Sequence, residues 1–144
     1  MDSFANQRCG WRYGGFFLSL ADDLAEAVSI QLRFYTPDEN GETREELHER
    51  FDEAPPPPRI IPEAGETYWQ WYWEISDTLR RVTDGAPNPI PPTEYLAWAQ
   101  MTGRIVWPSE YAILQAMDRA FCKMTGQEIK EYMERKFPPK QKGK

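Results

Sequence analysis

Four consecutive prolines at positions 55–58 constrain the fold of this chain more than any other feature. Proline lacks the backbone N–H that helices and sheets require, and successive prolines adopt the extended polyproline II conformation. The run therefore predicts a stiff spacer between two regions of regular structure. Together with Arg59 it also contains a P-x-x-P core, the type of segment that aromatic-lined adaptor modules bind. We favour the spacer, because the motif is short and common.

The charge of the chain changes at the same place. Residues 1–63 carry 6 basic and 13 acidic side chains, whereas residues 64–144 carry 11 basic and 10 acidic ones. The net charge of −6 argues against a protein that binds nucleic acid by neutralising phosphates. Two distant cysteines, Cys9 and Cys122, with no second ligand at metal-binding spacing, predict neither a disulfide nor a metal site. We expect no cofactor.

Composition and hydropathy divide the chain into four segments. No apolar stretch approaches the roughly 18 residues of a membrane-spanning helix, so we expect no membrane contact. The predicted segments are an acidic, partly helical region at 1–54, a proline-rich linker at 55–65, an aromatic-rich helical domain at 66–137 and a basic tail at 138–144.

Helical periodicity and capping signals dominate the sequence. Thr43 and Glu46 form a Thr-x-x-Glu capping box, Gly103 is a stop signal, and Trp107 followed by proline is a start signal. A second such box at Thr125 predicts that one helix ends and another begins there. The predicted helices cover residues 20–33, a segment from Thr43, and residues 68–83, 93–102, 108–125 and 125–137.

Two segments give weaker signals. Residues 8–15 contain three glycines and no usable period, so we predict irregular structure there. Residues 69–75 alternate tryptophan with other side chains, which also fits a half-buried strand. The apolar stripe continues at helical spacing to Leu79, and the run is too long for an ordinary strand, so we favour a helix. The predicted fold class is all-α: a small bundle of about four short helices, preceded by a less ordered acidic helical region and the polyproline spacer.

The sequence contains few residues that could act in catalysis. His48, the only histidine, lies among acidic residues in the most polar segment, as expected for a solvated helix. Glu74 and Asp77 are three residues apart, but paired carboxylates are common on helix surfaces. Asp118 is better explained as the partner of an arginine or as a cap. We therefore expect that the protein is not an enzyme.

Tryptophan is the most informative residue type in this chain. Five of the six tryptophans fall within the 39 residues from 69 to 107. Trp69 and Trp73 share a helical face, whereas Trp71 is rotated by about 160° from both, so one face cannot bury all three. Exposed aromatic patches usually mark partner surfaces. The predicted partner-binding residues are Trp69, Trp71, Tyr72, Trp73, Trp98, Trp107 and Tyr111.

Three motifs within residues 66–125 also carry a resemblance. They are the aromatic run Tyr-Trp-Gln-Trp-Tyr-Trp-Glu-Ile-Ser at 68–76, the Ile-Pro-Pro-Thr-Glu-Tyr-Leu-Ala-Trp run at 90–98, and Met-Asp-Arg-Ala-Phe at 117–121. In this order they resemble the tail assembly chaperones of long-tailed bacteriophages. Residues 1–63 do not resemble any part of that family.

The resemblance implies a non-catalytic protein of the host cytoplasm. Such chaperones hold the tape measure protein soluble until tail-tube subunits polymerise around it, and many are made with a longer frameshifted form. The implied partners are therefore the tape measure protein, the tail-tube protein and a frameshifted form of the chain itself. Two alternatives remain: a structural or connector protein retained in the virion tail, and an acidic regulatory or decoy protein.

Overall fold

The computed structural model describes residues 3–140 and 143, with side chains described for residues 15–140 and 143. Helices dominate this part of the chain, which confirms the predicted all-α class. The elements in chain order are α1 (Ser3–Phe34), α2 (Arg44–Arg50), the short 3-10 helix η1 (Glu63–Gly65), α3 (Glu66–Ser76), β1 (Val82–Thr83), β2 (Ala86–Pro87), α4 (Pro92–Thr102) and α5 (Pro108–Lys136).

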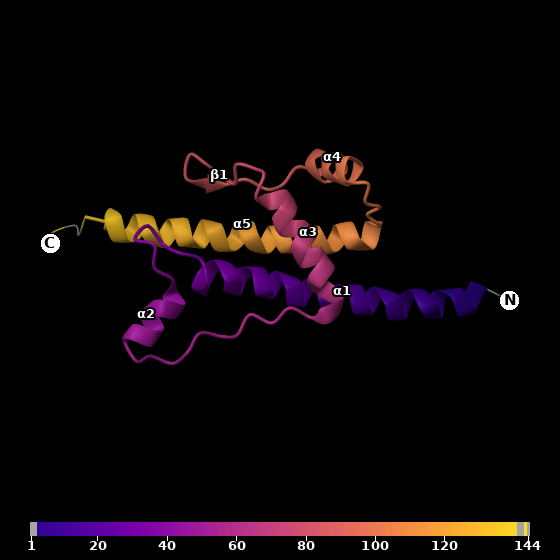
Figure 1. The fold of residues 1–144 in the computed structure, drawn as a ribbon, viewed down its shortest axis with the longest axis horizontal. Coiled ribbons are helices and arrows are strands. Elements are labelled where there is room, and N and C mark those ends of the chain that lie inside the picture. Colours follow the sequence, from indigo (N-terminus) through magenta and orange to yellow (C-terminus); the bar gives the residue numbers. More distant parts are fainter. Residues whose placement is uncertain (1–2, 141–142, 144) are drawn as a thin grey trace.

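Two long helices form the frame of the molecule. Helices α1 and α5 lie side by side and run in the same direction, and α3 crosses both of them (Figure 1). The β1–β2 hairpin and α4 lie on the α5 side, whereas α2 lies beside the end of α1. Helix α1 also continues beyond the point where α5 starts. No helix among the described residues has the length and apolar character needed to cross a membrane.

Helix α1 is longer than predicted. Its periodic part, residues 20–33, is helical as expected and buries Leu20, Leu24 and Val28. The prediction of irregular structure at residues 8–15 is wrong, because the backbone there belongs to α1. Glycine costs only about 1 kcal/mol in a helix, and the segment contains neither proline nor a β-branched residue to end one.

One hydrophobic core joins α1 to the aromatic half of the chain. Gly65 allows η1 to approach α1 closely, since a Cβ atom there would lie 2.9 Å from Leu24 Cδ2. The acidic region is therefore packed against the aromatic region through the core. The core consists of Leu20, Leu24, Val28, Tyr72, Ile75, Ile90, Tyr95, Ile113, Leu114, Met117 and Phe121.

Residues 53–62, which include the proline run, form neither helix nor strand. The segment follows the side of α1: Pro57 and Pro58 line a small cavity with Ile30, and the Tyr35 hydroxyl donates to the Pro57 carbonyl at 3.4 Å. The division of the chain at residues 55–65 stays a prediction, because a shared core does not test whether either side folds alone.

The aromatic run at residues 69–75 is helical, as favoured, and not a strand. However, α3 ends at Ser76 instead of residue 83. Residues 82–87 form a β-hairpin with a two-residue turn. The turn residues, Asp84 and Gly85, have φ angles of 52° and 76°. Both angles match the type I′ turn that Asp-Gly favours. The Asp-Gly pair, which follows the predicted helix at 68–83, is therefore a hairpin turn.

Helix α5 starts where the sequence predicts, but it does not end at Thr125 as predicted. Helix α5 begins at Pro108, and the Trp107 backbone N–H donates to Glu110 at 2.9 Å. The predicted break at Thr125 is wrong, because α5 continues to Lys136. Glu128, which would have formed the capping box, instead accepts hydrogen bonds from Arg33 and Arg44 at 2.7 and 2.6 Å. This contact between distant segments competes with the local capping signal.

The remaining helix ends agree with the sequence. Thr43 and Glu46 form the reciprocal capping box at the start of α2. Gly103 ends α4 in the left-handed conformation, with φ 67°. Phe51, at the end of α2, is 67% exposed.

Candidate partner-binding surface

The structure places the seven predicted contact residues at different depths. Tyr72 is fully buried in the core, so it is not available at the surface of this conformation. Trp107, at the start of α5, is 65% exposed. The other five are half-buried: Trp69, Trp71, Trp73, Trp98 and Tyr111.

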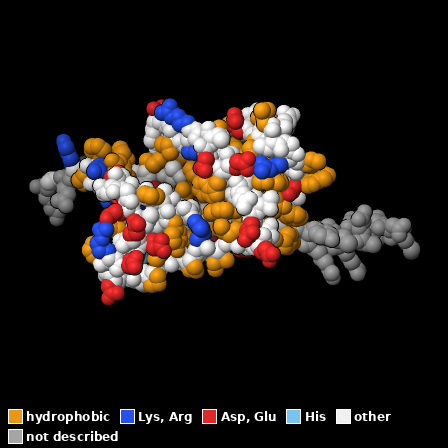
Figure 2. Space-filling model, viewed as in Figure 1, with side chains coloured by type: hydrophobic (Ala, Val, Ile, Leu, Met, Phe, Trp, Pro, Cys, Tyr) orange, Lys and Arg blue, Asp and Glu red, His pale blue; other side chains and the backbone are white. Residues whose placement is uncertain are grey.

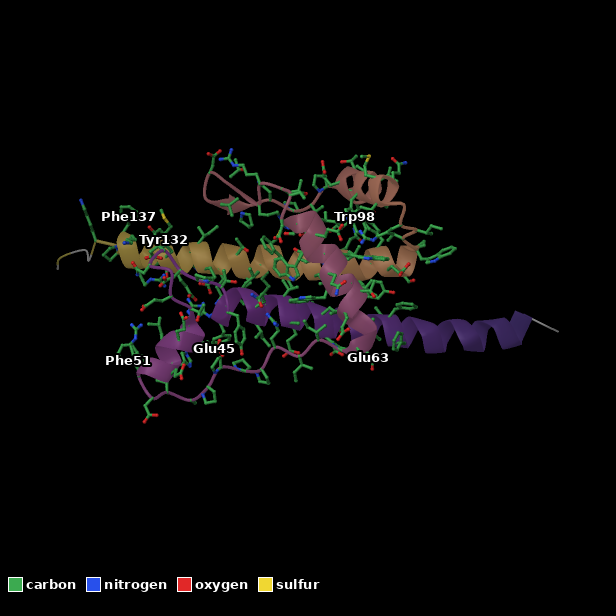
Figure 3. The ribbon with its side chains drawn as sticks, viewed as in Figure 1. Glu45, Phe51, Glu63, Trp98, Tyr132 and Phe137 are labelled. Atoms are coloured by element: carbon green, nitrogen blue, oxygen red, sulfur yellow. The ribbon has the colours of Figure 1, made fainter. Side chains whose placement is uncertain are left out.

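One aromatic cluster joins α3 to α4. The rings of Trp71 and Trp98 meet edge to face with centroids 5.4 Å apart, and Tyr68 packs on the other side of Trp71. The Arg104 guanidinium lies 5.0 Å from the Trp98 centroid, and Glu74 accepts from it at 3.0 and 3.1 Å. Figure 3 shows Trp98 on the side of α4 that faces α3 and α5. These contacts fix the position of α4.

The other two tryptophans of α3 belong to a different environment. Trp69 and Trp73 pack edge to face, 5.6 Å apart, and Trp73 also contacts Phe121 of α5. Arg59 of the proline-rich segment lies 5.7 Å from the Trp69 ring. The predicted separation of Trp71 from this pair therefore holds, and the tryptophans form two clusters instead of one patch.

Exposed apolar side chains gather around α4. Leu96 is 61% exposed, Met101 87%, Ile105 74% and Trp107 65%, and all four lie within 12 residues of sequence. We call these four residues the α4 surface. In Figure 2, apolar side chains cluster over α3 and around α4. Sequence analysis identified only Trp107 among them. The available signal was that α4 carries apolar residues on all sides, which a partly exposed short helix does not need for folding.

Two polar atoms on the inner side of α4 are buried without a hydrogen-bond partner among the described residues. They are the Tyr95 hydroxyl and Trp98 Nε1, three residues apart on the helix. Burial also raises the pKa of Tyr95 above its ordinary value. An unpaired buried polar group costs roughly 1–3 kcal/mol, so these two atoms offset part of the stability gained by packing α4.

Asp118 is part of a buried polar network. It accepts hydrogen bonds from Arg81 at 2.5 Å, from the Tyr72 hydroxyl at 3.0 Å and from the Ile90 backbone N–H at 2.9 Å. Arg81 also donates to Ser76 at 2.5 Å. Burial, together with the nearby Asp118 charge, raises the pKa of Tyr72 far above its ordinary value. The network ties the hairpin and the start of α4 to α5, which confirms the expected arginine partner of Asp118.

The other titratable residues considered for catalysis are engaged separately. Glu74 pairs with Arg104, as described above, while Asp77 is exposed at the end of α3. His48 of α2 contacts the Ala54 carbonyl at 2.8 Å. Within residues 15–140, no group of three or more His, Cys, Asp or Glu side chains is placed to hold a metal ion.

The fold and the surface together define a mostly helical protein with aromatic clusters and exposed apolar residues around one short helix. The sequence model of a family described as phage tail assembly chaperone matches residues 39–123, more than half of the chain. The protein therefore belongs to the phage tail assembly chaperone family, which confirms the resemblance. None of the curated proteins and none of the solved structures with which the chain was compared matches it.

The matched segment extends from the loop before α2 into α5. The expectation that residues 1–63 lie outside the family is therefore wrong for residues 39–63. The segment contains all seven predicted contact residues and the α4 surface, whereas α1 and the last part of α5 lie outside it. Membership of this family suggests a non-enzymatic role in which the protein binds other tail proteins.

Proposed function

We propose that this protein holds the tape measure protein of its phage soluble during tail assembly in the host cytoplasm, and that it helps to recruit tail-tube subunits. The observation that carries the proposal is the α4 surface, which exposes four apolar side chains within the segment that matches the family. Clustered apolar residues on a soluble protein are typical of protein-binding sites.

The chemistry of this surface suits an apolar, helical client. Trp107 and Met101 offer large apolar side chains, and the flexible, polarisable methionine adapts to irregular partner surfaces. The partner residues that we propose are the α4 surface together with Trp71 and Trp98 behind it, and then Trp69, Trp73 and Tyr111. Tyr72 supports them from the core.

The two buried polar atoms without hydrogen-bond partners on the inner side of α4 support the same role. Client binding that shifts α4 slightly would give the Tyr95 hydroxyl and Trp98 Nε1 access to hydrogen-bond partners. Part of the cost of moving α4 would then be offset by the hydrogen bonds formed.

Co-expression with the tape measure protein tests the proposal. We expect the wild-type chain to raise the soluble fraction of the tape measure protein, and Trp107→Ala combined with Met101→Ser to remove most of that effect. Phe51→Ala is the control, because Phe51 is exposed to nearly the same extent as Trp107, at 67%, but lies just after α2, at the other end of the molecule (Figure 3). Equal loss of solubility from the control would refute the α4 surface as the binding site.

The alternative function as a virion component has its own test. If mass spectrometry detected the chain in purified, infectious particles at a fixed ratio to tail subunits, a structural role would replace the proposed one. We expect its absence from finished particles. For the recruitment step, we expect the complex of chain and tape measure protein to bind tail-tube subunits in a pull-down experiment and to lose the chain as the tube polymerises.

A further inference from the structure

A second apolar surface, with no residue in common with the α4 surface, lies in a groove between the two long helices. The groove has a volume of about 520 Å³. Phe17, Leu18 and Ala21 of α1 form one wall, and Ser109, Ala112 and Ala116 of α5 form the other. Leu18 is 70% exposed, although it borders a hydrophobic core. The open groove is therefore an unpartnered face of the α1–α5 pair.

The two walls differ in size in a complementary way. The α1 wall carries the large side chains Phe17 and Leu18 beside Ala21, whereas the α5 wall carries the small residues Ser109, Ala112 and Ala116 together with the buried Ile113. A surface with a ridge on one side and a hollow on the other fits a copy of itself that has been rotated by 180° about an axis along the groove. The ridge of each copy then enters the hollow of its partner.

The charges at the groove are complementary in the same way. Asp22 stands on the α1 wall and Arg119 on the α5 wall. Both side chains are exposed, and neither forms an ion pair within the part of the chain that the structure describes. Both residues line the same groove, so the opposite charges lie on facing walls of one surface. The same two-fold rotation brings Asp22 of each copy toward Arg119 of the other.

We propose that this groove is the contact surface of a homodimer, formed by two copies of the chain related by a two-fold axis along the groove. A two-fold interface requires a self-complementary patch, in which residue i contacts residue j and j contacts i. The pairs Leu18 with Ala112 and Asp22 with Arg119 satisfy this requirement in size and in charge. An antiparallel arrangement would instead bring α1 against α1 and place the Asp22 carboxylates near each other.

The size of the face sets the expected strength of the dimer. The residues that line the groove span less than two turns of α1, about 8 Å, and about three turns of α5, about 15 Å. Such a face buries less than the roughly 800 Å² per subunit of a standard stable interface. We therefore expect a reversible dimer with a dissociation constant in the micromolar range. None of the residues that line the groove belongs to the α4 surface, so the dimer can be measured without the proposed client.

Two charge-reversal variants test the pairing directly. In Asp22→Arg, two arginines face each other at both contacts of the dimer, and in Arg119→Asp, two aspartates do. We expect each variant alone to dimerise at least about tenfold more weakly than the wild type. A mixture of the two variants restores opposite charges at both contacts, so we expect a heterodimer with about the wild-type dissociation constant.

Sedimentation velocity of the full chain, from micromolar to millimolar concentration, measures these constants. Circular dichroism and thermal melting of each variant establish that it folds, which both exposed positions should allow. Leu18→Ala should also weaken the dimer about tenfold, while Leu96→Ala, at a leucine of similar exposure on α4, should not change it.

Three results would overturn the proposal. The first is a wild-type chain that stays monomeric at millimolar concentration. The second is a dimer that both charge-reversal variants form as strongly as the wild type. The third is a mixture of the two variants that associates no better than either variant alone, because recovery in the mixture requires the two residues to meet across the interface.

Discussion

The core between α1, α3 and α5 and the surface around α4 contain similar apolar residues in opposite environments. Leu24, Val28, Leu114 and Met117 have no exposed surface, whereas Met101 is 87% exposed. Polar groups differ in the same way. Asp118 in the core has three hydrogen-bond donors, while the Tyr95 hydroxyl under α4 has no partner among the described residues.

This contrast separates residues needed for folding from residues available for binding. Burial of a large apolar side chain stabilises a fold by about 1.5–3 kcal/mol. The side chains of the α4 surface are mostly exposed, so they contribute only a small part of this stabilisation. Substitutions should therefore change stability strongly in the core and weakly around α4. The order of their effects tests the comparison.

The largest expected effect is at the polar centre of the core. Asp118→Ala leaves the Arg81 guanidinium buried without its carboxylate, and it removes the acceptor of the Ile90 N–H. Removal of one partner of a buried ion pair typically costs about 3–5 kcal/mol. We expect a loss of that size in the free energy of unfolding, measured by urea titration. A loss below about 1 kcal/mol would show that the network does not hold the hairpin and α4 to α5.

A matched pair of leucines gives the next largest effect. Leu114 is fully buried, so Leu114→Ala should cost about 2–5 kcal/mol through lost burial and the cavity that remains. Leu96→Ala, at a position that is 61% exposed, should change the free energy of unfolding by no more than about 0.5 kcal/mol. Both values come from the same urea titrations. Equal effects of the two substitutions would remove the distinction between core and α4 surface.

The sequence predicted the helices whose signals are local. The spacing of Leu20, Leu24 and Val28 and the cap at Thr43 each depend on residues less than three turns apart, and each prediction is confirmed. The prediction at Thr125 was wrong because the deciding contacts come from Arg33 and Arg44, more than 80 residues away. Arg81 as the partner of Asp118 could not be identified for the same reason.

The partner surface was harder to predict than the helices. Helical spacing shows which residues share a face of α3, but not which face the rest of the chain covers. Tyr72 therefore could not be distinguished from its tryptophan neighbours, although it is the one that enters the core. Leu96, Met101 and Ile105 were missed because sequence alone does not show that α4 packs through only one side.

A pair of glycines gives smaller effects than Asp118 and Leu114, and tests how closely η1 packs against α1. A Cβ atom at Gly65 would lie 2.9 Å from Leu24 Cδ2 and 3.1 Å from Leu20 Cδ1, and both leucines are buried and cannot move away easily. Gly65→Ala should therefore cost about 1–3 kcal/mol through overpacking.

Gly126 provides the control, because substitution by alanine there should raise the stability instead of lowering it. It lies inside α5, and its nearest neighbour to an added Cβ is Pro87 Cγ at an ordinary 3.8 Å. Gly126→Ala should stabilise the protein by about 0.5–1 kcal/mol, because alanine favours the helix. Thermal melting of the two variants measures both signs. A Gly65→Ala variant that is as stable as Gly126→Ala would mean that η1 does not press against α1, and that the acidic region is joined to the rest of the protein less tightly than the core of this structure implies.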